Sequence, residues 1–108
     1  MNISMAGRNI ELTEPIKDHI SSSVETLKKF NLDIISVNVI ISTQAKKNKE
    51  HSVVDFVINL AHKNTIVIQQ NDEDLYAAVD LATARAQKAL YGNQVKAIQT
   101  ISHDDAKQ

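Results

Sequence analysis

The stretch that decides the fold of this chain is ISVNVIISTQAKKNKEHSVVDFVINL, residues 35–60. On both sides of a lysine-rich centre, apolar residues alternate with polar ones, which is the period of a half-buried β-strand. The pattern predicts one strand on Ile35, Val37, Val39 and Ile41, and another on Val54, Phe56, Ile58 and Leu60. The polar residues 44–50 between them predict a turn.

Further strands are predicted on both sides of this stretch. Residues 65–69 predict a short strand after a tight connection at His62-Lys63-Asn64. The apolar residues of this strand do not alternate, so the pattern leaves its buried face open. Residues 2–6 alternate apolar and polar up to Gly7, which predicts an N-terminal strand.

Two amphipathic helices flank the three central strands. The first is predicted to begin at Thr13, with Pro15 in its first turn, and to end before Asn31 and Asp33. Its apolar stripe is Ile16, Ile20, Val24 and Leu27. The second is predicted to be capped by Asn71 or Asp72 and to stop at Gly92-Asn93. Its stripe is Leu75, Val79, Ala82, Ala86 and Leu90.

The order of these elements predicts an α+β fold, β-α-β-β-β-α. We expect two helices on one face of a four-stranded antiparallel sheet, an arrangement that resembles double-stranded-RNA-binding domains. With 108 residues the chain has room for one core. We expect a folded domain over residues 1–92 and a flexible tail over residues 93–108. In that tail, Val95, Ile98 and Ile101 would either continue the helix or dock as a strand.

Composition argues against an enzyme. The chain has no cysteine, and its four histidines fall in different predicted elements, without the spacing of metal ligands. The acidic run Asp72-Glu73-Asp74 is better explained as compensation of a helix N-terminus than as a catalytic site. We therefore predict no catalytic residue, no metal and no cofactor. No signal sequence or membrane span is evident, so a soluble cytoplasmic protein is expected.

Basic side chains suggest a local phosphate-binding face, although the net charge is −1. On a helical wheel, the second helix carries Arg85 and Lys88 on one flank, and Lys96 would extend this patch. The candidates on the first helix are Lys17, Lys28 and Lys29. If the helices pack side by side, these residues would form one basic surface. The alternative is that they are ordinary solvated side chains near helix ends.

Two further features allow a binding role or an ordinary one. The cluster Lys46-Lys47-Asn48-Lys49 would contact phosphate or would simply be a flexible polar turn. Tyr76 and Tyr91 would stack on bases. For Tyr76, the sequence favours partial burial with a hydrogen-bonded hydroxyl group.

Two motifs resemble the ribosome hibernation-promoting factor family, also known as the ribosome-associated inhibitor or sigma-factor modulation family. One is Gly7-Arg8-Asn9-Ile10-Glu11-Leu12-Thr13, entering a helix that ends Leu27-Lys28-Lys29-Phe30. The other is Glu73-Asp74-Leu75-Tyr76-Ala77-Ala78-Val79-Asp80. They occur in the family's order and spacing, and the resemblance covers about residues 1–92.

The resemblance implies a short family member that binds the small ribosomal subunit between head and body. There it would occupy the sites of messenger RNA and transfer RNA and silence translation in starvation or stationary phase. Lys29, Arg85 and Lys88 match basic family positions best, Lys17 matches another, and Lys28 and Lys96 match less well. Members often carry more basic residues near Ser23 and Thr26, and their second helix often continues through more lysines where this chain has Tyr91-Gly92-Asn93.

Three other functions are considered beside this one. The chain would be a generic RNA-binding module, a protein-interaction domain that uses its sheet face or a strand edge, or a small enzyme for which the sequence offers no site. We expect a monomer. The sequence leaves open whether the chain promotes ribosome dimers or idles single ribosomes, and what residues 93–108 do.

Overall fold

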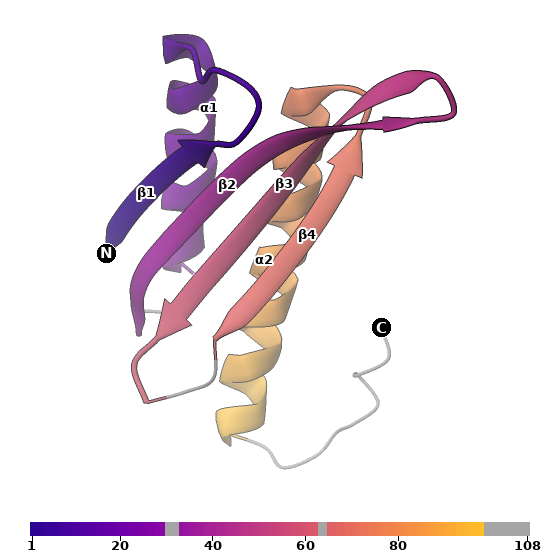
Figure 1. Cartoon of the computed structure of the whole chain (residues 1–108). Helices are drawn as coiled ribbons and strands as arrows, with labels where there is room; N and C mark the ends of the chain where they lie inside the picture. The colour runs from indigo at the N-terminus through magenta and orange to yellow at the C-terminus, as the bar shows by residue number, and fades with distance from the viewer. Residues whose placement is uncertain (30–32, 63–64, 99–108) are drawn as a thin grey trace.

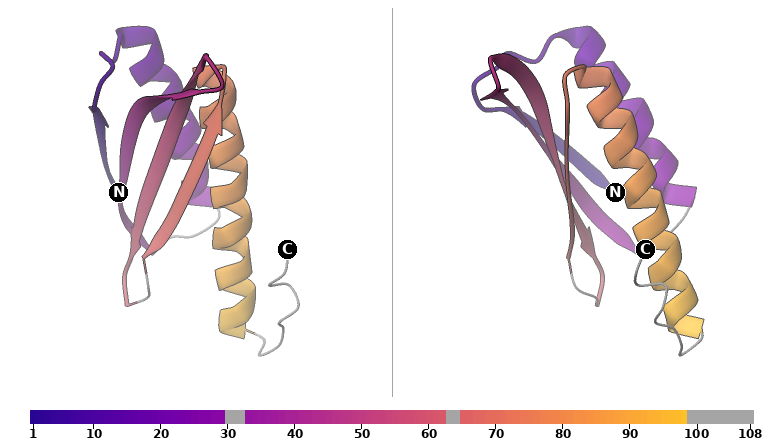
Figure 2. Two further views of the ribbon diagram at one scale, coloured as in Figure 1. Left: turned by 45° about the vertical axis from the view of Figure 1, so that its right-hand side comes forward. Right: turned by 90° about the vertical axis from the view of Figure 1, so that its right-hand side faces the viewer.

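The chain folds into a four-stranded sheet with two α-helices on one face, which confirms the predicted order β-α-β-β-β-α (Figures 1 and 2). The computed structural model describes residues 1–29, 33–62 and 65–98, with side chains as far as residue 92. The elements are β1 (Asn2–Gly7), α1 (Glu14–Glu25), the short 3₁₀ helix η1 (Thr26–Lys29), β2 (Ile34–Lys46), β3 (Lys49–Leu60), β4 (Ile66–Asp72) and α2 (Leu75–Ile98).

The strands lie in the sheet in the order in which they occur along the chain. The pairs β2–β3 and β3–β4 are antiparallel, whereas β1 runs parallel to β2. The expected all-antiparallel sheet is therefore wrong at this edge. The reason is α1, which connects β1 to β2. It brings the chain back to the end of the sheet at which β1 begins, as a crossover between parallel strands must.

Helix α1 begins as predicted at the backbone, but not through the expected side-chain cap. Thr13 has the extended backbone of an N-cap residue, and Pro15 lies in the first turn, yet the Thr13 hydroxyl makes no capping hydrogen bond. The predicted stripe faces the core, since Ile20, Val24 and Leu27 are fully buried and Ile16 is partly buried.

The alternation predicted for β2 holds everywhere except at its start. Val37, Val39 and Ile41 are buried, but the side chain of Ile35 is 53% exposed, and Ile34 is buried instead. The pairing with β3 shifts between Ile34 and Ser36, so an irregularity of the bulge type reverses the faces at this end. In β3 all the predicted inward residues, from Val54 to Leu60, are buried.

The connection between β2 and β3 is much shorter than the predicted turn over residues 44–50. The strands pair as far as Lys46 opposite Lys49, which leaves a two-residue turn of Lys47 and Asn48. Both turn residues have positive φ angles, 50° and 66°, as the turn of a two-residue hairpin requires. At the other hairpin, Lys63 and Asn64 lie outside the described residues.

Strand β4 is longer than expected and does alternate. It runs to Asp72, with Ile68 buried and the side chain of Val67 64% exposed. The cap of α2 is Asp74 and not Asn71 or Asp72, because Asp74 Oδ1 accepts a hydrogen bond from the backbone N–H of Tyr76 at 3.1 Å. Asp72 supports this turn by accepting a hydrogen bond from the N–H of Asp74 at 3.0 Å.

Helix α2 does not stop at Gly92-Asn93 but continues to Ile98. A glycine stop requires a left-handed backbone, and no glycine among the described residues has a positive φ. Val95 and Ile98 therefore continue the helix, while Ile101 lies outside the described residues. The flexible tail stays a prediction.

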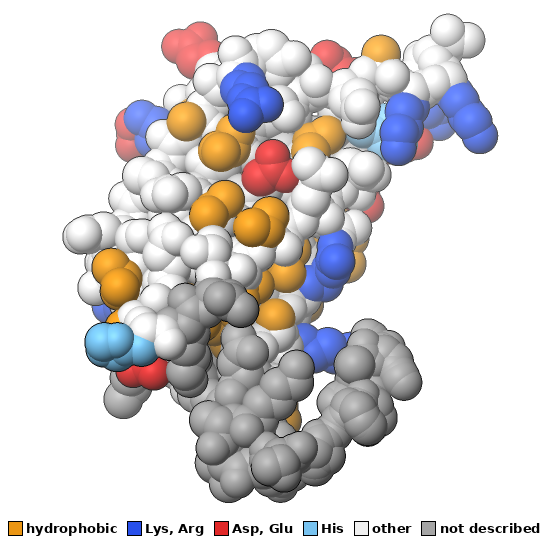
Figure 3. Space-filling model, turned by 60° about the horizontal axis from the view of Figure 1, so that its bottom comes forward, with side chains coloured by type: hydrophobic (Ala, Val, Ile, Leu, Met, Phe, Trp, Pro, Cys, Tyr) orange, Lys and Arg blue, Asp and Glu red, His pale blue; other side chains and the backbone are white. Residues whose placement is uncertain are grey.

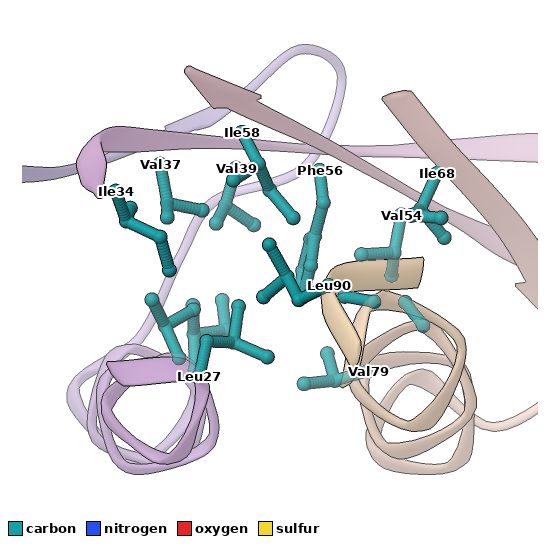
Figure 4. Packing of buried hydrophobic residues seen from close by; sticks show 14 of the residues in the cluster. Leu27, Ile34, Val37, Val39, Val54, Phe56, Ile58, Ile68, Val79 and Leu90 are labelled. Atoms are coloured by element: carbon teal, nitrogen blue, oxygen red, sulfur yellow. The ribbon is translucent and has the colours of Figure 1, made fainter. Parts of the chain in front are cut away.

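One apolar core fills the space between the sheet and the helices. Side chains from β2, β3 and β4 point toward both helices, and Phe56 points toward the space between them (Figure 4). On the α2 side, Ala78, Ala82 and Ala86 are completely buried, so small side chains bring the helix backbone close to the sheet. Within the described chain, no helix is long and apolar enough to cross a membrane.

Candidate RNA-binding surface

Arg85 lies on the flank of α2 that borders the edge strand β4. Its Nη1 donates hydrogen bonds to the backbone oxygen of Gln69 at 2.8 Å and to Oε1 of Gln70 at 3.0 Å. Lys88, three residues along the helix, is exposed and makes no ion pair or hydrogen bond with the described residues. Arg85 is thus partly held by the protein, whereas the Lys88 ammonium group is free for an anion.

Two of the lysines on the first helical segment are already paired with acids. The Nζ of Lys17 lies 3.8 Å from Glu14, and that of Lys28 lies 3.1 Å from Glu25; the two lysine side chains are 47% and 52% exposed. Such exposed pairs contribute at most about 1 kcal/mol, so a phosphate would compete with them easily. Lys29, at the end of η1, is exposed and has no ion-pair partner within the described residues.

Among the described residues, the side-chain hydrogen bonds that join the first helical segment to α2 involve no lysine or arginine. His19 Nε2 lies 2.8 Å from Asp80 Oδ1, and Gln87 Nε2 donates to Thr26 Oγ1 at 2.9 Å. The ring of Tyr76 meets that of His19 edge to face, with centroids 4.9 Å apart. The sequence pattern did not reveal this seam, because its residues are far apart in the chain.

These contacts divide the predicted basic residues into two groups. Lys17 lies about 160° around α1 from His19, so it lies on the outer flank of α1. Lys28 and Lys29 belong to η1, which follows the end of α1. Arg85, bonded to β4, lies on the outer flank of α2. Lys17 and Arg85 therefore lie on two outer flanks of the helical layer, the two basic flanks, and the contacts between His19 and Asp80 and between Gln87 and Thr26 form a seam between them.

The remaining candidates are placed less completely. Lys96 lies within α2, but its side chain is outside the described residues. Tyr76 is 40% exposed and Tyr91 is 59% exposed. The ring contact of Tyr76 agrees with its predicted partial burial, but its hydroxyl group makes no hydrogen bond with the described residues. The acidic residues Asp72 and Asp74 make the helix-start hydrogen bonds expected of them.

The family model described as "Sigma 54 modulation protein / S30EA ribosomal protein" matches residues 3–96. The chain belongs to this family. The match confirms the resemblance carried by the two sequence motifs. The matched range contains α1, β2, β3 and β4 completely and nearly all of β1 and α2.

Curated relatives of this family member carry names that refer to ribosome hibernation. The ribosome hibernation promotion factor of Bacillus subtilis is 28% identical over 99 residues, which is 89% of this chain but 50% of the relative. The ribosome hibernation promoting factor of Azotobacter vinelandii is 23% identical over 99 residues, 92% of this chain and 88% of the relative. The chain thus spans half of the former and most of the latter. Both relatives are named for ribosome hibernation.

Solved structures show the same fold. A ribosomal subunit interface protein from Coxiella burnetii superposes with a TM-score of 0.78 at 21% identity, over 89% of this chain and all of the other. The N-terminal domain of Thermus thermophilus Protein Y gives a TM-score of 0.72 at 25% identity, over 86% of this chain and 99% of the other.

Proposed function

We propose that this family member binds the small ribosomal subunit and silences translation by occupying the sites of messenger RNA and transfer RNA. The observation that carries the proposal is the family match over residues 3–96, supported by relatives named for ribosome hibernation. The protein would act in the cytoplasm under stress or in stationary phase. It would act as a monomer by occupancy alone, without chemistry or a cofactor.

The two basic flanks suit a protein held between two RNA walls. Lys17 lies on one flank of the helical layer and Arg85 on the other, so RNA would contact the domain from both sides. Phosphate contacts of this kind fix position without reading sequence. A plug held on both sides would block a channel better than one attached at a single face.

Individual basic residues would contribute unequally. Lys29 and Lys88 are the strongest candidates, because each is exposed and has no partner among the described residues. Arg85 uses Nη1 for its two bonds to β4, which leaves its Nε and Nη2 donors for a phosphate. Lys17 and Lys28 would first release Glu14 and Glu25. Lys96 would extend the α2 flank.

The positions without basic residues set the expected affinity. Thr26, where relatives often carry a cation, is bonded to Gln87 at the helix seam, and Ser23 is only partly exposed. Fewer phosphate contacts give weaker binding and a shallower dependence on salt.

Co-sedimentation with separated ribosomal subunits across a salt series tests the proposal. The unaltered protein should pellet with the small subunit and lose this binding as salt rises. The double variant Arg85→Glu with Lys88→Glu should no longer pellet, while its circular dichroism stays that of a folded protein. The single variant Lys88→Glu leaves the bonds of Arg85 to β4 intact. Comparing it with the double variant separates the effect of losing Lys88 from the effect of losing Arg85 and its bonds. Unchanged pelleting of a folded double variant would contradict the assignment.

A protein partner is the second candidate function, and one observation favours it. On its open face, the sheet carries the apolar side chains of Ile40, Val57 and Val67. Figure 3 shows apolar side chains gathered on one face of the molecule. Salt-insensitive binding to a protein, without ribosome affinity, would support this role. Binding to isolated duplex RNA as tight as to ribosomes would instead indicate a generic RNA-binding module.

A further inference from the structure

The β2–β3 hairpin projects beyond both edge strands. On one side, the ladder of β1 ends at Gly7 opposite Ile41, and the side-chain amide of Asn9 then bonds to Thr43 N–H at 2.8 Å and to Thr43 O at 3.1 Å. On the other side, the ladder of β4 ends at Asp72 opposite Ser52. Residues 44–51, the ribbon, therefore continue as two strands alone, and this arm extends away from the sheet (Figure 1).

The tip of the ribbon concentrates positive charge. Lys46 and Lys49 are directly opposite each other in the ladder, and Lys47 lies in the turn between them. Like charges in directly opposite positions destabilise a strand pair. Only Lys49 has an acidic partner among the described residues, Glu73 at 3.4 Å. An anionic ligand would remove the repulsion that the protein leaves largely uncompensated.

The turn holds these charges in a defined place. Lys47 has a φ of 50° and Asn48 a φ of 66°, the left-handed conformations that match the twist of a two-residue hairpin. Glycine or asparagine is preferred at such positions, so the lysine at position 47 contributes a charge where the backbone favours another residue. Such an unfavourable choice at an exposed tip is typical of a binding site.

We propose that Lys46, Lys47 and Lys49 form a second phosphate-binding site, which holds a segment of RNA backbone separate from the RNA at the helices. The inference rests on the proposed function, because the RNA is taken to be ribosomal. The ribbon residues 44–51 include no phenylalanine, tyrosine or tryptophan, so they lack the stacking platforms of a base-reading surface. Lysines on a narrow arm reach the sugar-phosphate backbone of a groove or crevice without recognising sequence.

The position of the arm explains why the RNA segment is a different one. The domain is elongated, with extents of 45 × 30 × 18 Å. The arm lies at the end where α1 and α2 begin, whereas Lys29 follows the end of α1 and Lys88 lies far along α2 (Figures 1 and 2). Lysine and arginine side chains are visible at this projecting end in Figure 3. A single phosphate group therefore cannot contact both the tip of the arm and Lys29 or Lys88.

Directed cleavage of RNA tests the proposal in the full chain. Because the chain has no cysteine, Gln44→Cys places a single iron–EDTA probe on the ribbon, and Ala84→Cys places a matched probe on the exposed face of α2. Bound to small subunits, the ribbon probe should cut an RNA segment that the helix probe leaves intact. Cleavage by the helix probe alone would overturn the second site and leave the proposed function standing. Failure of both proteins to bind the subunit would overturn the two together.

The salt dependence of binding gives an independent measurement. The double variant Lys46→Gln with Lys47→Asn removes two charges and retains Lys49 with its Glu73 contact. The slope of log K against log salt should become shallower by about 1.4–1.8, the value for two lost phosphate contacts. The control Glu50→Gln removes an acid from the same ribbon and should tighten binding. Unaltered slope and affinity in the double variant would overturn the site, and so would binding of the ribbon to a protein of the subunit alone.

Discussion

Gly7 ends β1 at a place where no side chain fits. A Cβ atom on Gly7 would lie 2.3 Å from the backbone oxygen of Ile10. Because this oxygen belongs to the backbone, it cannot move away as the end of a flexible side chain could. Gly92 is the opposite case, because a Cβ atom there would meet no heavy atom within 4 Å apart from its chain neighbours and the backbone of its own helix. Gly7 is therefore required for steric reasons, whereas Gly92 occupies a helix position that has space for a side chain.

The two alanine variants should change stability in opposite directions. Gly7→Ala should lower the free energy of unfolding by about 1–3 kcal/mol, because the backbone must shift to relieve the overlap. Gly92→Ala should raise it by up to about 1 kcal/mol, because alanine favours a helix interior over glycine. Urea titrations followed by circular dichroism measure both. Equal stability of Gly7→Ala and the unaltered protein would show that the loop after β1 adapts freely.

At the scale of elements, the sequence predicted most of what local periodicity controls. The inward stripes of α1, β3 and α2 were correct, because each follows from a simple period of hydrophobic residues. The exposure of Ile35 was not predicted, since it depends on an irregular register with β3. The predicted stop at Gly92-Asn93 was wrong, because glycine also fits a helix interior when φ stays negative. Of the two alternatives left open for Val95 and Ile98, the structure shows the continued helix.

The ribbon turn offers a prediction about its own element. Changing Lys47→Asn together with Asn48→Gly installs the preferred pair for two left-handed residues and should raise the free energy of unfolding by roughly 0.5–1 kcal/mol. If the tip binds RNA, the same variant should bind small subunits more weakly, since one lysine is lost. Thermal unfolding and co-sedimentation measure the two effects. A stability no higher than that of the unaltered protein would show that the turn carries no strain.

At the scale of the whole molecule, the candidate site could be predicted residue by residue but not as a surface. The wheel for each helix placed Lys17 with Lys28, and Arg85 with Lys88. It gave no information on which flank would face the other helix. That choice depends on tertiary contacts such as His19 with Asp80, which no single periodicity contains.

Opposite flanks should act independently in binding. The losses of binding free energy caused by Lys17→Gln and by Lys88→Gln should add to within about 0.5 kcal/mol when the two changes are combined. The matched comparison combines Arg85→Gln with Lys88→Gln. These side chains are three residues apart and would contact one stretch of phosphate, so their losses of binding free energy should not add. Titration of small subunits with labelled protein measures each value. Strong coupling between Lys17 and Lys88 would mean that both contact the same RNA segment.

The agreement between strand order in the sheet and order along the chain has a consequence for synthesis. As the polypeptide leaves the ribosome, each new strand finds its neighbour already made, so the sheet can grow without waiting for distant residues. Helix α2 is made after every strand, and it packs on β3 and β4. Until α2 has formed, it does not cover Val54, Phe56 and Ile68, so the nascent chain exposes part of this apolar surface.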